Sequence, residues 1–204
     1  MINYPNDAEL LRSEIAAAAA RMIAEDGADY GSAKRKAAKL ILGNNKVSGD
    51  ILPDNAQIEA EVREYQALFF GDEQPQRLRQ LRALALALMD RFADFSPHVT
   101  GAIVNGTASE HSDIHLQLFA ESSKDVAVFL LNSDIDYQVS ETTHFRYPDR
   151  RVETLSFIWK KEGVHLTLYD YDDLRGAGKG TGKRRIERAN RTALQSLIDE
   201  SEEK

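Results

Sequence analysis

The residues best suited to chemistry lie near the middle of the chain, on either side of a short polar loop. Alternation along an extended strand places Asp113 and His115 on the same face. A carboxylate and an imidazole in that arrangement can bind one metal ion from one side. Gly101 and Gly106 precede them, and glycine-containing turns hold phosphates through backbone N–H groups. The pattern predicts a phosphate-holding turn that leads into a metal-binding strand.

The segment Gly101-Ala-Ile-Val-Asn-Gly-Thr-Ala-Ser-Glu-His-Ser-Asp113, followed by Ile114-His-Leu116, resembles the nucleotidyltransferase fold of the DNA polymerase β superfamily, and in particular its small members. In that family a strand and a Gly-Ser turn precede an Asp-x-Asp strand, and a later strand supplies a third carboxylate. The resemblance covers roughly residues 97 to 140. His115 departs from it, because an Asp is expected at that position.

The resemblance implies a set of site residues. Metal ligands would be Asp113, His115 and Asp136, with Glu153 as the alternative third carboxylate, and Asp113 and Asp136 would be catalytic. The positions near the phosphates would be Gly101, Gly106, Thr107 and Ser109. The cofactor would be a divalent ion, Mg²⁺ or Mn²⁺, which aligns the phosphate for in-line attack.

Two features of this segment leave alternatives open. The Gly-Ser position is occupied either by Gly101-Ala102 or, in a second register with a strand over residues 102–104, by Gly106-Thr107. His115 is a poor ligand for Mg²⁺, which prefers oxygen. Asp113, His115 and His165 would form an alternative set of two histidines and one carboxylate for a transition metal, if the strand of His165 lies beside that of Asp113.

Two functions follow from the resemblance. The first is metal-dependent transfer of a nucleotidyl group from a nucleoside triphosphate to an unknown acceptor. The alternative is a catalytically silent member of the fold that serves as a binding or regulatory module, because His115 weakens two-metal chemistry. A transition-metal hydrolase is a more distant third class.

Composition sets the wider limits. The 204 residues carry a formal net charge of −7 and no cysteine, which excludes disulfides and fits a cytoplasmic protein. No apolar stretch is long enough to span a membrane. The acidic balance argues against general binding to nucleic acid. The densest basic patch, where a polyanionic acceptor would be expected to bind, comprises Lys179, Lys183, Arg184, Arg185, Arg188 and Arg191.

Hydrophobic periodicity predicts an α+β protein. Apolar residues recur at helical spacing up to about residue 95, and after Pro97 the period changes to two. We therefore expect a helical region over residues 1–95 packed on a mixed or antiparallel sheet of nucleotidyltransferase-like type over residues 96–204. The predicted strands are residues 99–105, 113–119, 135–140, 152–159 and 164–169. Residues 124–132 fit either a helix or a buried strand, and the preceding Ser123 favours the helix.

Overall fold

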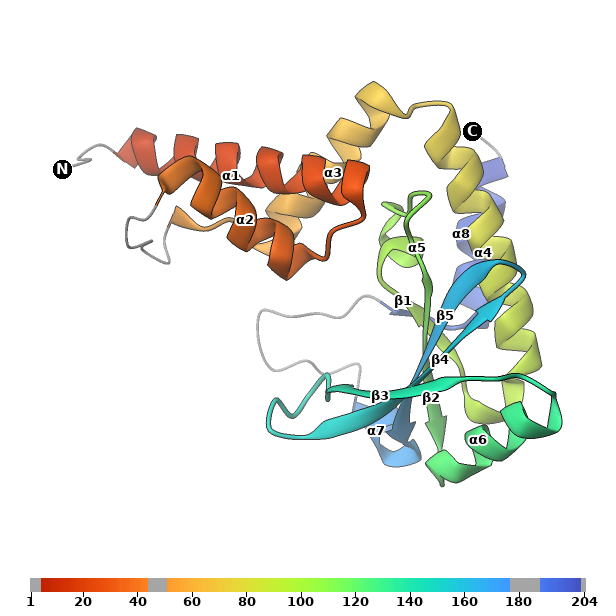
Figure 1. Cartoon of the computed structure of the whole chain (residues 1–204). Helices are drawn as coiled ribbons and strands as arrows, with labels where there is room; N and C mark the ends of the chain where they lie inside the picture. The colour runs from red at the N-terminus through yellow and green to blue at the C-terminus, as the bar shows by residue number, and fades with distance from the viewer. Residues whose placement is uncertain (1–4, 44–50, 177–187, 203–204) are drawn as a thin grey trace. The chain divides into compact units, whose positions relative to one another are not determined.

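The computed structural model describes residues 5–43, 51–176 and 188–202. It is an α+β protein (Figure 1) that divides into two compact units. The first unit comprises Met1–Arg77 together with Thr107–His111, and the second comprises Leu78–Gly106 with Ser112–Lys204. The expected boundary at residue 95 therefore differs from the observed division, because most of helix α4 (Glu73–Arg91) belongs with the sheet.

The first unit is built around three helices: α1 (Pro5–Asp26), α2 (Tyr30–Leu42) and α3 (Asn55–Phe69). Asp29 caps α2 by accepting a hydrogen bond from the Ser32 N–H, and Asp54 begins α3 with a capping box. Small side chains let the helices approach closely. Their fully buried residues include Ile15, Ala19, Ala33, Ala37, Ile58 and Val62.

The second unit contains a six-stranded sheet in the order β3-β4-β5-β2-β1-β6. Its strands are β1 (His98–Thr100), β2 (Ile114–Ala120), β3 (Gln138–Thr143), β4 (Arg151–Trp159), β5 (Glu162–Asp170) and β6 (Arg188–Ala189). β2 and β5 are parallel, and the other neighbours are antiparallel. The sheet is therefore mixed.

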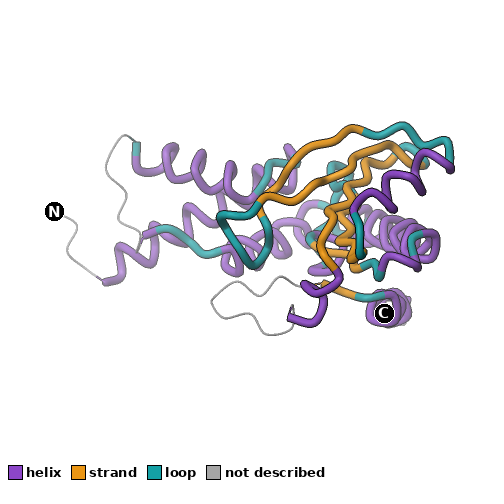
Figure 2. The backbone as a smooth tube through the Cα atoms, turned by 90° about the horizontal axis from the view of Figure 1, so that it is seen from below, coloured by secondary structure: helices purple, strands orange, loops and turns teal. Residues whose placement is uncertain are grey.

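Helices α4, α6 (Ser123–Asn132) and α8 (Arg191–Glu202) lie on one face of this sheet (Figures 1 and 2). The short helices of the unit are η2 (Ala93–Phe95), α5 (Ala102–Asn105) and α7 (Tyr171–Gly176). The core under α4, α6 and α8 includes Leu81, Leu88, Phe92, Leu116, Leu118, Leu130, Leu166 and Leu194, all fully buried. The alternate residues of the strands form the opposite face, which we call the polar face.

Most of the expected elements are present. The first strand of the described chain begins at His98, so the change of period at Pro97 does mark the change from helix to sheet. Residues 124–132 are helical as predicted, but Ser122, not Ser123, is the cap: its side chain accepts a hydrogen bond from the Lys124 N–H. The prediction of a continuous strand over residues 99–105 is wrong, because the chain turns at Gly101 and enters α5. No helix in the described ranges is long and apolar enough to cross a membrane.

Candidate functional site on the polar face of the sheet

The turn after β1 has the backbone that the glycines predict. Gly101 has a φ of 74° and Gly106 a φ of 85°, values that favour glycine over other residues. A Cβ at either position would meet nothing within 4 Å, so the backbone conformation and not crowding requires glycine. Residues 102–104 are helical, so the strand that the second register places there is absent. Gly101-Ala102 begins the turn.

A row of polar residues crosses the polar face of the sheet. Strand register places these residues directly opposite one another from strand to strand, and directly paired residues share a face. From β3 to β6 the row reads Gln138, Ser156, His165, His115, Thr100 and Arg188. The parallel pairing of β2 with β5 brings His115 beside His165, although they are far apart in the chain.

His165 has a hydrogen-bond partner at each ring nitrogen. Its Nε2 lies 3.0 Å from Asp113 Oδ2, and its Nδ1 lies 2.8 Å from Ser156 Oγ. A carboxylate can only accept, so Nε2 carries the proton, and in the neutral ring Nδ1 accepts from the Ser156 hydroxyl. Gly163 makes room for Asp113, because a Cβ there would lie 2.3 Å from Asp113 Oδ1. These contacts fix the orientation of the imidazole.

His115 stacks on His165, with ring centroids 4.7 Å apart and 18° between the planes. The residue is solvent-exposed, yet protein atoms around the ring lower the pKa of His115 by desolvation. Repulsion from His165 lowers that pKa further, and Asp113 opposes the shift. The pair therefore favours a neutral His115, since two stacked imidazolium ions would repel each other.

The structure does not bring Asp136 to this group. Asp136 is exposed and precedes the edge strand β3, and two strands separate β3 from β2. At about 4.8 Å between neighbouring strands, β3 and β2 lie about 14 Å apart. The alternative carboxylate, Glu153, alternates with Ser156 and so points to the other face of β4.

The donor set does not fit a divalent metal centre. Among the described residues, no group of three or more histidine or acidic side chains could hold a metal ion. Asp113, His115 and His165 are neighbours, as the alternative transition-metal set requires, but both ring nitrogens of His165 already have partners. Mg²⁺ in addition prefers an all-oxygen shell, and this row offers imidazoles.

Thr107 and Ser109, expected near phosphates, belong to the helical unit. Three side chains donate hydrogen bonds to three consecutive carbonyl oxygens of this loop: Gln66 to Thr107 and Gln74 to Ala108, each at 2.9 Å, and Arg77 to Ser109 at 3.4 Å. The Thr107 residue is only 3% exposed. The helical unit therefore holds the loop by its backbone.

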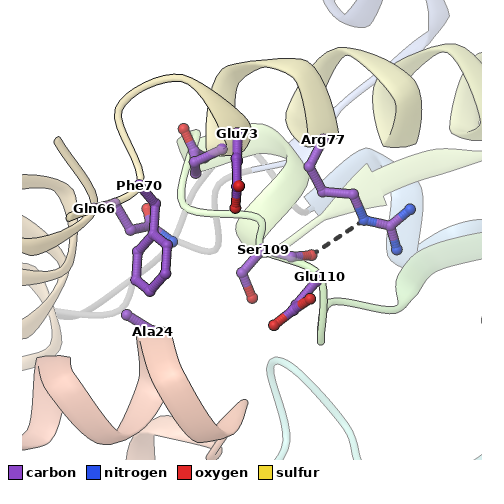
Figure 3. Close-up of a pocket in the computed structure, with 8 residues that line it drawn as sticks. Ala24, Gln66, Phe70, Glu73, Arg77, Ser109 and Glu110 are labelled. Atoms are coloured by element: carbon purple, nitrogen blue, oxygen red, sulfur yellow. Dashed lines mark hydrogen bonds between the residues drawn. The ribbon is translucent and has the colours of Figure 1, made fainter.

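A pocket of about 200 Å³ lies beside this loop (Figure 3). Its lining is Ala24, Gln66, Phe70, Glu73, Gln74, Arg77, Ser109 and Glu110. Two carboxylates and one guanidinium line it with a single aromatic ring, so its acidic side chains outnumber its basic one and do not favour a phosphate. It contains none of the residues expected to bind metal.

The sequence pattern does not identify three residues of this site: Ser156, Gly163 and Gln138. Alternation over residues 152–159 separates Thr154 and Ser156 from the apolar Leu155 and Phe157, so a polar face was readable. Which strand Ser156 would neighbour was not readable, because that depends on pairing between distant segments.

Comparison with known proteins adds no family assignment: no protein-family model matches the chain, and no curated protein matches it at a significant level.

Proposed function

We propose that this chain is a nucleotidyltransferase-like binding protein that does not carry out metal-dependent nucleotidyl transfer. The observation that carries the proposal is that His115, which stands where the resemblance expects an Asp, stacks on His165 of the neighbouring strand. Two-metal transfer depends on acidic side chains that bind the ions and align both oxygens of the displacement. Here the acidic member, Asp113, is hydrogen-bonded to His165.

The remaining parts suit binding better than catalysis. The Gly101 turn and the short helix α5 are compatible with the phosphate-holding turn that the resemblance implies, and the row on the polar face offers hydrogen-bonding side chains and the guanidinium of Arg188. A nucleoside triphosphate is the ligand class that the resemblance suggests. The rival function, transfer to an acceptor, would need a third carboxylate near Asp113, but Asp136 precedes β3, and β4 and β5 separate β3 from β2.

A transfer assay tests this proposal. Native protein is incubated with ATP or GTP labelled at the α-phosphate, with Mg²⁺ or Mn²⁺, and the release of pyrophosphate is followed. The matched control is Asp113→Asn, which keeps the size of the side chain and removes its charge. We expect native and control to be indistinguishable from background. Metal-dependent release that Asp113→Asn abolishes would overturn the proposal.

A second variant asks whether the fold still accepts a metal. Replacing both His115 and His165 with Asp supplies oxygen ligands on adjacent parallel strands beside Asp113. Calorimetry should detect Mg²⁺ binding to this double variant and none to the native protein. Equal Mg²⁺ affinity in both proteins would contradict the part assigned to the imidazoles.

A further inference from the structure

Two arginine side chains, Arg146 and Arg188, lie at one end of the polar face of an acidic chain. Two of the carboxylates there already have partners: Asp170 pairs with Arg150, and Asp173 pairs with the buried His144. Arg146 and Arg188, by contrast, have no carboxylate partner among the described residues. Two cationic side chains are thus left for an external anion.

Arg188 extends from β6 across the polar face. Its guanidinium carbon lies 5.3 Å from the centroid of the Phe119 ring. Its Nη1 is buried and has no hydrogen-bond partner in the described structure. Burial lowers the pKa of Arg188, and repulsion from Arg146 lowers it further. An unpaired guanidinium N–H under protein atoms is costly, so an acceptor that reaches it would stabilise the protein.

Arg146 lies in the β3–β4 loop and is held near the same end of the face. Its guanidinium carbon lies 5.9 Å from the Phe145 ring and 5.8 Å from the Tyr147 ring. The Phe145 ring contacts Tyr169, with centroids 4.9 Å apart, and Tyr169 stacks on Phe119 at 5.5 Å. The ring that Arg146 contacts is thus connected through Tyr169 to the ring that Arg188 contacts. These ring contacts restrict the positions of both guanidinium groups.

We propose that Arg146 and Arg188 form an anion site on the polar face that binds the phosphate or diphosphate group of a small ligand. Guanidinium groups bind phosphate oxygens through paired N–H donors, which makes arginine well suited to this anion. The site rests on the proposed function and deepens it by naming the chemistry of the ligand. Tyr147, 46% exposed, offers a ring for a flat group attached to the phosphate.

Calorimetry on the full chain tests the site with EDTA present, so that no metal mediates binding. The probes are inorganic pyrophosphate, ATP and adenosine. We expect saturable binding of pyrophosphate and ATP and none of adenosine. Pyrophosphate that binds as tightly as ATP would indicate recognition of the anion alone, and tighter ATP would indicate a nucleotide. Both outcomes support the site.

The variants are Arg188→Gln and Arg146→Gln, with Arg151→Gln as the matched control. Arg151 also carries one positive charge in the second unit, but its exposed side chain bonds to Thr143 Oγ1 and to the Glu141 carbonyl. Each test variant should weaken pyrophosphate binding at least about tenfold, and the control should change it less than about twofold. Arg188→Gln should also remain folded, because it removes the buried Nη1 group, which has no hydrogen-bond partner in the described structure.

Three results would overturn the site. They are the absence of saturable binding by the native protein, an equal loss in Arg151→Gln, and binding of a single-stranded oligonucleotide without binding of pyrophosphate or ATP. Any of these three results would overturn the anion site without contradicting the proposed lack of transfer activity. Metal-dependent transfer by the native protein would overturn the proposed function and leave the anion site standing.

Discussion

A buried histidine beneath the β3–β4 loop should control the stability of the sheet unit. The side chain of His144 is fully buried, and that of Asp173 is 9% exposed. His144 Nδ1 accepts hydrogen bonds from the N–H groups of Arg146 and Tyr147, at 3.0 and 3.2 Å. Nδ1 therefore carries no proton, and the Nε2–H donates to Asp173 Oδ2 at 3.1 Å. The ring is neutral and its tautomer is fixed.

Asp173→Ala removes the acceptor and leaves the Nε2–H buried without a partner. A hydrogen bond to a charged group contributes about 1.5–3 kcal/mol, so the free energy of unfolding should fall by that amount. Asp173→Asn keeps an oxygen acceptor in the same place and should cost about 1 kcal/mol or less. Both variants remove the charge of Asp173, and they differ in whether the buried Nε2–H keeps an acceptor.

Urea unfolding followed by Trp159 fluorescence measures the effect. Trp159 is the only tryptophan and lies on β4, so its signal reports the sheet unit whether or not both units unfold together. With a slope of about 2 kcal/mol per molar urea, the Asp173→Ala midpoint should fall by about 1 M. Equal midpoints for the two variants, or a change under about 0.2 M for Asp173→Ala, would refute this reasoning.

Three further predictions concern the same unit. Desolvation, and then repulsion from His165, lowers the pKa of His115 in the folded protein below its ordinary value of 6.5. As the pH drops from about 7 to 5, the unfolded chain therefore binds more protons than the folded one, and the free energy of unfolding should fall. Urea midpoints of His115→Asn should depend less steeply on pH over this range. Gly163→Ala should displace Asp113 from His165, seen as a changed His165 signal in imidazole NMR spectra, whereas an unchanged signal would contradict the close approach. Phe92→Ala, at a residue 0% exposed, should cost about 3–5 kcal/mol in urea unfolding, and a loss under about 1 kcal/mol would show that the core is described wrongly.

The sequence predicts what depends on local pattern. The period change at Pro97 separates helices from strands, and the helix predicted over residues 124–132 is present, although Ser122 caps it and the predicted cap, Ser123, is its first residue. The sequence pattern predicts the turn at Gly101 but extends the strand before it to residue 105. Residues 102–104 are as apolar as a strand, and the strand ends at Thr100 because Gly101 adopts a positive φ.

The site depended on pairing that no local pattern encodes. His115 and His165 meet because β2 and β5 run parallel, and Ser156 meets His165 because β4 returns beside β5. Strand order also separates Asp136 from Asp113, whereas chain order alone suggested that they meet. Residues 177–187, which include most of the basic patch, lie outside the described residues, although Arg188 falls within them.

The central claim is that a stacked pair of imidazoles, of which His165 is hydrogen-bonded to Asp113, and not a metal centre, occupies the polar face. Long-range ¹H–¹⁵N NMR spectra of the imidazole rings test it directly, since the chain has five histidines that single His→Asn variants can assign. The account predicts a His165 ring protonated at Nε2 and unprotonated at Nδ1, with shifts unchanged by millimolar Mg²⁺. Saturable, Mg²⁺-dependent changes at His115 and His165 that Asp113→Asn abolishes would contradict it.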